Sequence, residues 1–264
     1  MSYLDKEHRY HIVTCEDGVV TLKFNRPKAM NAVNLGMIEE RNAILKEIFA
    51  DPDVKIIITT GDDKSYCAGG DLKLFSDYGV KEARDWSNMV VDSTLTFVNC
   101  SKITIAMVAG VCLGGGLESV LCHDFVIAAD NATFGLPEIN VGIFPGGGAT
   151  QRLPQILPPN KVKELIMLGD FFDANTALSL GIVNKVVPLA QLEEETQKLA
   201  KRLLKKPFFS LLMAKSSINS AWDLSLNNGL LVETHGWSMC FGTEDQKEGM
   251  QAFIEKRKPR YQGK

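Results

Sequence analysis

The sequence lacks the features that mark several classes of protein. No apolar run reaches the roughly 18 residues that a membrane-spanning helix needs. Neither sign of charge dominates, because 29 Lys and Arg stand against 32 Asp and Glu, so no broad field attracts a polyanion such as DNA. None of the six cysteines forms a C-x-x-C pair, and no His stands at metal-ligand spacing. We therefore expect no nucleic-acid partner, no membrane partner and no metal.

The opening segment, MSYLDKEHRYHI, is also short of apolar residues. It carries charges of both signs and no apolar signal region. The cysteines stand mostly inside apolar runs, as buried thiols do in a reducing compartment. These features predict a cytoplasmic protein. Because the chain has 264 residues, of which 45% are hydrophobic, we expect one main domain with a helical appendage.

Strand-like and helix-like segments alternate as far as Ala129. The tripeptide Glu16-Asp17-Gly18 lies between two β-rich runs, which indicates a hairpin. Runs of Ile and Val predict parallel strands that are buried on both faces. The expected strands are residues 54–60, 103–108 and 125–129, and the expected helices are residues 31–49, 80–99 and 117–122.

Helical patterns take over from Lys161 onward, and strand signals nearly vanish. Three prolines, Pro154, Pro158 and Pro159, mark this change. The expected helices are residues 162–169, 174–180, 189–204, 207–220, 224–241 and 245–257.

Three glycine-containing loops follow expected strands. The first, SYCAGGDL at residues 65–72, has a simple interpretation as a turn into a helix capped by Asp71. The second, GVCLGGGLE at residues 110–118, places three glycines at a helix start, where free N–H groups suit an anion or a polarised carbonyl. Neither loop matches a nucleotide phosphate cradle. The third, at residues 134–152, holds Glu138 in an apolar run.

Two glutamates therefore stand in apolar surroundings. Glu138 either pairs with a structural partner such as Arg152 or lies in a pocket with a perturbed pKa. Glu118 opens an apolar helix, where an acid also benefits from the helix dipole. Taken alone, each glutamate leaves both interpretations open.

Two other signals are discounted. Ser119, His123 and Asp124 suggest a Ser-His-Asp hydrolase, but helix neighbours followed directly by the acid do not supply the orientations of a triad. Cys67 has no His base nearby in the sequence, so it is interpreted as a packing residue.

Taken together, the loops resemble the signature segments of the enoyl-CoA hydratase (crotonase) family, in the family's order. The likeness covers nearly the whole chain and is more specific for the family than for the reaction. The segments are NRPKAMNA at 25–32, CAGGDL at 67–72, GVCLGGGLES at 110–119, LPEINVGIFPGGGATQRL at 136–153, AxxxGIVNKVV at 177–187 and GMQAFIEKRK at 249–258.

The resemblance implies an α/β fold, a crotonase-like spiral of ββα repeats over residues 1–200 with a helical C-terminal trimerisation region at residues 201–264. It implies homotrimers, or hexamers made of two trimers. The amides of Gly70 and Gly115 would bind the thioester oxygen as it gains negative charge. Glu118 and Glu138 would hold a water molecule and move protons at the α- and β-carbons.

Recognition of an acyl-CoA thioester is implied in the same way, with coenzyme A as part of the substrate and no separate cofactor. Gly146 would help to place the water, and Lys256 would reach the nucleotide end, often from a neighbouring subunit. A solvated surface charge is the simpler interpretation of Lys73 and Lys256. The implied binding residues are Lys28, Ala29, Met30, Ala68, Gly70, Asp71, Leu72, Lys73, Leu113, Gly115, Pro137, Gly146, Trp237 and Lys256.

The leading hypothesis is hydration of a 2-enoyl-CoA to a 3-hydroxyacyl-CoA, because both acids are present. Alternatives are double-bond isomerisation on the same scaffold and hydration of a cyclic dienoyl or carnitine-derived thioester. A non-catalytic, RNA-binding member of the fold would lack the glycines or acids and carry a basic surface, and neither is seen in the sequence. The residues suspected of lining the acyl pocket are Trp86, Met89, Val90 and Phe144.

Overall fold

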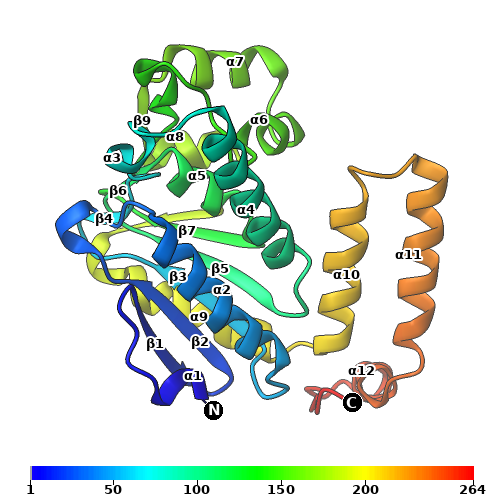
Figure 1. Ribbon diagram of the computed structural model, residues 1–264. Coiled ribbons are helices and arrows are strands. Elements are labelled where there is room, and N and C mark those ends of the chain that lie inside the picture. The colour runs from blue at the N-terminus through cyan, green and yellow to red at the C-terminus, as the bar shows by residue number, and fades with distance from the viewer. Residues whose placement is uncertain (1) are drawn as a thin grey trace.

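The computed structural model describes residues 2–264, without the side chain of Ser2, so residue 1 of the expected first region lies outside the described residues. The described chain folds around two sheets (Figure 1). The six-stranded sheet has the order β1-β2-β3-β5-β7-β10, and the four-stranded sheet has the order β4-β6-β8-β9. Their bounds are β1 His11–Glu16, β2 Val19–Phe24, β3 Ile56–Thr60, β4 Ser65–Cys67, β5 Ile103–Val108, β6 Val111–Leu113, β7 Phe125–Ala129, β8 Thr133–Gly135, β9 Phe171–Asp173 and β10 Lys185–Val187.

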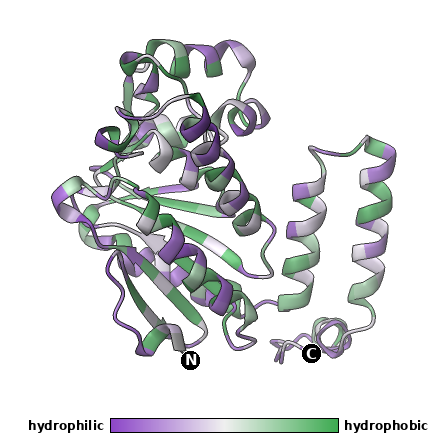
Figure 2. Cartoon of the chain, viewed as in Figure 1, coloured by the Kyte–Doolittle hydropathy of each residue, from purple (hydrophilic) through white to green (hydrophobic). Residues whose placement is uncertain are grey.

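The large sheet is parallel except at its first hairpin. β1 and β2 pair antiparallel around Asp17 and Gly18, which both have positive φ, so the expected hairpin is confirmed. β2, β3, β5, β7 and β10 then pair in parallel. The strands form the hydrophobic centre of the molecule (Figure 2), as expected for parallel strands covered on both faces.

Successive passes of the chain add one strand to each sheet. β3 is followed by β4, β5 by β6 and β7 by β8, and the shorter strands pair in parallel next to one another. Helices separate the passes, so the predicted crotonase-like spiral of ββα repeats is confirmed. The short strands arise within the segments expected to be glycine loops. Their three-residue length is too short for a recognisable alternation of side chains.

Helices cover both faces of the large sheet. Ile44 and Ile48 of α2 (Leu35–Ala50) pack with Leu22 and Ile57 on one face. Ala200 and Leu203 of α9 (Leu192–Leu204) pack with Ile56, Ile58 and Ile105 on the other face. Alternate residues of β3 therefore serve opposite cores. The other helices of this part are α1 Ser2–Asp5, α3 Leu72–Phe75, α4 Val80–Val98, α5 Gly115–Val120, α6 Ala149–Arg152, α7 Pro159–Leu168 and α8 Ala174–Ser179.

The last three helices project from this body (Figure 1). They are α10 (Phe208–Ser220), α11 (Leu226–Cys240) and α12 (Glu244–Ile254). Lys215 of α10 anchors them, because its Nζ lies 2.9 Å from Asp124 Oδ2 and 2.8 Å from the carbonyl oxygen of Lys102.

The second half of the chain differs from expectation in one respect. β9 and β10 lie beyond Lys161, where strand signals nearly vanish, because each is a three-residue strand added to an existing edge. The expected division between residues 200 and 201 falls within α9 and stays a prediction. Within residues 2–264, no helix is both long and apolar enough to cross a membrane.

The turn from β5 into β6 provides a test of how tightly the two sheets join. Gly110 has φ +60°, and a Cβ there would lie 2.0 Å from the carbonyl oxygen of Lys64. Gly110→Ala should therefore lower the free energy of unfolding by about 3 kcal/mol or more, measured by urea denaturation. Gly229→Ala in α11 is the matched control, because a Cβ there meets nothing within 4 Å; it should stabilise by up to about 1 kcal/mol. Equal effects of the two substitutions would contradict this account of the turn.

Candidate active site

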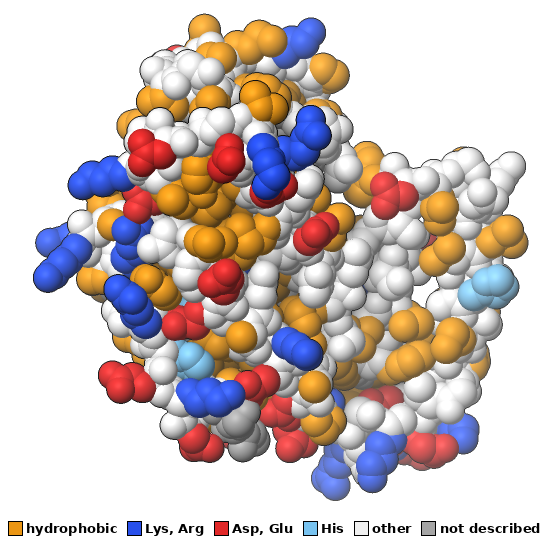
Figure 3. Space-filling view, viewed as in Figure 1, with side chains coloured by type: hydrophobic (Ala, Val, Ile, Leu, Met, Phe, Trp, Pro, Cys, Tyr) orange, Lys and Arg blue, Asp and Glu red, His pale blue; other side chains and the backbone are white. Residues whose placement is uncertain are grey.

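A cavity of about 710 Å³ opens among α2, α3, α4, α5 and the loops around Glu138 and Gly146. Its volume lies in the range of small-molecule sites. Figure 3 shows apolar side chains gathered beside α3 and the start of α4. Leu72 and Phe144 are exposed apolar residues of the cavity wall. Glycines 69, 70, 114, 115, 146 and 147 form part of the wall, so a ligand in the cavity meets main-chain atoms directly.

The amide N–H of Gly70 points into this cavity. Val33 donates its N–H to the carbonyl of Gly69 at 2.7 Å and accepts the N–H of Asp71 at 2.9 Å. Because backbone groups alternate sides along an extended segment, the N–H of Gly70 between them faces the opposite direction. It donates no hydrogen bond to another residue among those the structure describes.

A second free amide stands beside it. Gly115 is the first residue of α5, so its N–H has no acceptor within the helix, and no described residue accepts it elsewhere. A Cβ built on Gly115 would lie 3.7 Å from the nitrogen of Gly70, and one built on Gly69 would lie 3.3 Å from the nitrogen of Gly115. The two donors therefore converge on one small region of the cavity, which is the geometry that an oxyanion needs.

Side chains are excluded where these two segments meet. A Cβ on Gly70 would lie 2.4 Å from the ring of Phe75, and a Cβ on Gly116 would lie 2.2 Å from the carbonyl oxygen of Cys67. Gly69 and Gly114 also have positive φ, +98° and +51°. These glycines are thus required by close backbone packing as well as by the ligand.

Glu118 is held by backbone amides. Its side chain is buried, and Oε1 accepts the N–H of Gly147 at 2.8 Å and of Ala149 at 3.0 Å. Burial raises the pKa of the Glu118 carboxyl, while these hydrogen bonds and the nearby charge of Arg152 oppose the rise. Its orientation is therefore fixed by the loop that follows Glu138.

Glu138 is held much less firmly. It lies in the 3-10 helix Pro137–Val141, and its Oε2 is buried without a hydrogen-bond partner. Within the described chain it forms no ion pair, so pairing with Arg152 is not observed. Burial, together with the smaller effect of the Glu118 charge, raises the pKa of Glu138 to about 7. The two acids therefore share one cavity and titrate as a pair.

Eight of the expected site residues lie on the cavity wall. These are Ala68, Gly70, Leu72, Gly115, Glu118, Pro137, Glu138 and Gly146.

Several of the other expected residues adjoin wall residues through a hydrogen bond or along the chain. Met30 is half-exposed, and its carbonyl accepts the N–H of Ala68 at 3.0 Å, so exposed Lys28 and neighbouring Ala29 lie beside residue 68. Lys73 is exposed, and Leu113 is not among the wall residues.

Asp71 caps α3 as the sequence predicted, and it also makes an ion pair that the sequence did not reveal. Its Oδ2 accepts a hydrogen bond from Arg26 Nη2 at 2.7 Å, and its Oδ1 accepts the N–H of Lys73 at 3.2 Å as the cap of α3. Its carboxylate therefore fixes the loop that carries Gly70.

Trp237 and Lys256 are not brought to the cavity by this chain. Trp237 lies on α11, where it is 65% exposed and packs against Phe241, and Lys256 follows α12 on the surface. A role for either residue at the site requires a second subunit.

Of the four residues expected to line the acyl pocket, Trp86, Val90 and Phe144 line the cavity, and Met89 is not among its wall residues. Sequence reasoning missed His11 and Arg41, which also line it. The position of Arg41 four residues after buried Met37, one turn along α2, was the available signal.

No triad forms around His123. Its Nδ1 bonds the carbonyl of Ser119 at 2.9 Å and its Nε2 bonds Thr59 Oγ1 at 2.7 Å, while Asp124 pairs with Lys215. Burial raises the pKa of the Cys67 thiol to about 11, which suits packing. No cluster of three or more metal-ligating side chains occurs within residues 2–264.

Comparisons with known proteins agree with this geometry. Residues 14–264 match the family model described as enoyl-CoA hydratase/isomerase. The chain is 39% identical to crotonyl-CoA hydratase of Syntrophomonas wolfei, over 95% of this chain and 96% of that protein. It is 36% identical to the short-chain-enoyl-CoA hydratase of Clostridium acetobutylicum, over 94% and 95%. The crystal structure of enoyl-CoA hydratase from Bacillus anthracis superposes with a TM-score of 0.92 at 34% identity, over 97% of this chain and 100% of that one.

The raised pKa of Glu138 predicts a cost in stability. Between pH 4.5, its ordinary pKa, and about 7, the folded protein holds a proton that the unfolded chain has released, so stability falls as pH rises. Glu138→Gln removes this dependence. It should therefore stabilise the protein at pH 8 by on the order of 1 kcal/mol more than at pH 5, because the site is partly solvated. Urea denaturation at both pH values measures the difference, and an equal effect at both would contradict the raised pKa.

Proposed function

The chain belongs to the enoyl-CoA hydratase/isomerase family, and from that premise we propose that it adds water across the 2,3 double bond of an acyl-CoA thioester to give a 3-hydroxyacyl-CoA. The observation that carries this proposal is a pair of acids, Glu118 and Glu138, in one cavity with two unpaired amides. The reaction needs no cofactor beyond the coenzyme A of the substrate.

The amides of Gly70 and Gly115 bind the thioester oxygen. Attack at the β-carbon moves negative charge onto that oxygen as the enolate forms, so donors that are already in place stabilise the transition state more than the substrate. A single donor of this kind contributes about 3 to 4 kcal/mol. Both donors are main-chain groups fixed by sheet and helix, so little reorganisation accompanies the reaction.

The two acids divide the proton transfers. Glu118 accepts two N–H bonds that favour its ionised form, which suits the group that takes a proton from the attacking water. Glu138 has a pKa near 7 and a free oxygen, which suits the group that supplies a proton to the α-carbon. The pair thus carries one proton before the reaction, on Glu138, and one proton after it, on Glu118.

Glu118→Gln and Glu138→Gln should each lower kcat for hydration of crotonyl-CoA by about 100-fold to 10,000-fold, because each removes one proton transfer. The affinity for saturated butyryl-CoA, which cannot react, is the control and should change little. In ¹⁸O-water, the parent should place the label in the acyl chain; isomer formation without label would indicate an isomerase instead. Rates within about tenfold of the parent would contradict the proposed roles.

The pH dependence follows from the shared proton. Above about pH 7 the pair loses the proton that the α-carbon must receive, so kcat/KM should fall about tenfold for each pH unit. Steady-state rates between pH 6 and 9 test this, and a constant kcat/KM above pH 7 would contradict the assignment of Glu138 as acid.

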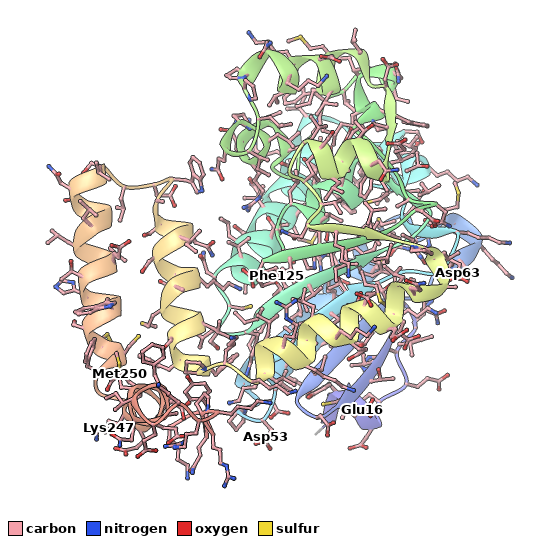
Figure 4. The ribbon with its side chains drawn as sticks, turned by 180° about the vertical axis from the view of Figure 1, so that it is seen from behind. Glu16, Asp53, Asp63, Phe125, Lys247 and Met250 are labelled. Atoms are coloured by element: carbon pink, nitrogen blue, oxygen red, sulfur yellow. The ribbon has the colours of Figure 1, made fainter. Side chains whose placement is uncertain are left out.

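We also propose that the active form is a trimer or a pair of trimers. Figure 4 shows α11 and α12, the latter with Lys247 and Met250, standing away from the sheet and from α9. α10 packs against both through Leu211 and Leu212. These helices expose a large set of apolar side chains, which includes Leu226 at 77%, Phe253 at 85% and Ile254 at 72%. Exposed apolar surface of this extent supports contact with other subunits. In such an assembly Trp237 and Lys256 would contribute to a neighbouring site.

Phe253→Asp should break the assembly, because it places a charge in the proposed contact. Light scattering after gel filtration should give a multiple of 29.1 kDa for the parent and a smaller mass for the variant. Val80→Asp is the control, since Val80 is 81% exposed at the start of α4 and lies outside these helices. A monomeric parent, or equal masses for parent and Phe253→Asp, would contradict the proposal.

A further inference from the structure

Arg41 places an unpaired positive charge in the wall of the cavity. Its guanidinium carries five N–H donors, and only Nη2 has a partner, Ser93 Oγ at 2.6 Å. The Nε of Arg41 is buried and makes no hydrogen bond. No carboxylate within the described chain pairs with the guanidinium of Arg41. Burial of this side chain lowers its pKa. A buried cation in this state is unfavourable unless a further partner arrives.

His11 adds a second unpaired polar atom to the same wall. Its Nδ1 lies 2.8 Å from Glu40 Oε1, and Glu40 also accepts the N–H groups of Arg9 and Tyr10. The Nε2 of His11 is buried without a partner. Both His11 and Arg41 line the cavity, and no ion pair between Arg41 and Glu40 occurs among the described residues.

The position of Arg41 along the cavity can be placed relative to the acids. The N–H of Gly147 binds the Glu118 carboxylate, and a Cβ on Gly147 would lie 3.1 Å from Val90 Cγ1. Val90 is therefore the residue of α4 that stands beside the catalytic carboxylate. Ser93, the partner of Arg41, lies about one helical turn further, roughly 5 Å. Met37, one turn before Arg41 on α2, also lines the cavity, as do Ile38 and Val90, so the wall beside Arg41 is apolar. An acyl chain that extends past the reacting carbons therefore crosses apolar surface and ends at a cation.

We propose that the acyl pocket selects thioesters whose chain ends in a carboxylate, so that the preferred substrate is the mono-CoA thioester of an unsaturated dicarboxylic acid. This inference rests on the proposed function for the reaction and adds the class of acyl group. The guanidinium offers Nε and its free Nη hydrogens to two carboxylate oxygens, a bidentate pairing that Arg favours. A carnitine-derived thioester ends in a quaternary ammonium group, which Arg41 repels, and a purely hydrocarbon ring leaves the cation unpaired.

Binding of two saturated thioesters tests this without requiring hydration. Hexanoyl-CoA and the CoA monothioester of hexanedioic acid have the same chain length and differ only in a terminal methyl or carboxylate. Titration calorimetry with the full-length parent should show the carboxylate ligand binding at least about tenfold more tightly. Equal affinities, or preference for hexanoyl-CoA, would overturn the proposal whatever the behaviour of any variant.

Variants then identify the residue responsible. Arg41→Met should abolish the preference, because the affinity for the carboxylate ligand should fall at least about tenfold relative to the affinity for hexanoyl-CoA. Arg41→Lys should retain part of the preference. Arg84→Met makes the same change at an exposed site on α4 outside the cavity and should keep the preference of the parent. The assignment would be overturned if Arg41→Met lowered the affinity for both ligands by the same factor, or if it kept the preference for the carboxylate ligand.

Failure of the two proposals is distinguishable. Hydration of crotonyl-CoA by the parent tests the reaction, whereas the binding ratio of the saturated pair tests the acyl end. A protein that hydrates crotonyl-CoA without preferring the carboxylate ligand refutes only the proposed role of Arg41. A protein that prefers the carboxylate ligand but hydrates no enoyl-CoA refutes only the proposed reaction.

Discussion

The structure of the site depends on close contact between two backbone segments, residues 67–70 and 114–116. At Gly69 and Gly116, a side chain as small as a methyl group would lie 3.0 Å and 2.2 Å from a carbonyl oxygen. Val33 holds the first segment through the groups on either side of Gly70, and the paired strands β4 and β6 hold both segments at their ends. The position of the two free amides is therefore a property of the sheet and not of any mobile loop.

The acids depend on the same framework in different ways. Glu118 stands on the helix that begins at the second segment, and the amides of Gly147 and Ala149 fix its carboxylate. Glu138 stands on a short 3-10 helix after β8, and one of its oxygens has no partner. Two chemically identical side chains thus acquire unlike proton affinities from unlike hydrogen bonding, although burial acts on both.

The sequence predicted the long elements well and the short ones poorly. Buried β-strands such as Ile56–Thr60 and amphipathic helices such as α9 carry enough side chains for a pattern to be visible. Strands such as Val111–Leu113 do not, because pairing with neighbours, and not composition, makes them strands.

The same distinction applies to the site. The glycine loops and both glutamates were recognised from motifs, whereas the ion pair between Arg26 and Asp71 and the location of Arg41 depend on contacts between residues far apart in sequence. Trp237 on α11 and Lys256 just beyond α12 are exposed on the described chain, so nothing in the structure of one chain connects them to the cavity.

The main-chain origin of the proposed oxygen-binding donors has a consequence for how such a scaffold diversifies. Substitution of a side chain cannot delete an amide N–H, short of proline, so point mutations leave the enolate-stabilising half of the machinery in place as long as the fold persists. What mutation can freely exchange is the set of carboxylates and the lining of the acyl pocket. New reactions of thioesters can therefore arise on this framework by replacing a few side chains, while the step common to all of them, stabilisation of charge on the carbonyl oxygen, is inherited unchanged.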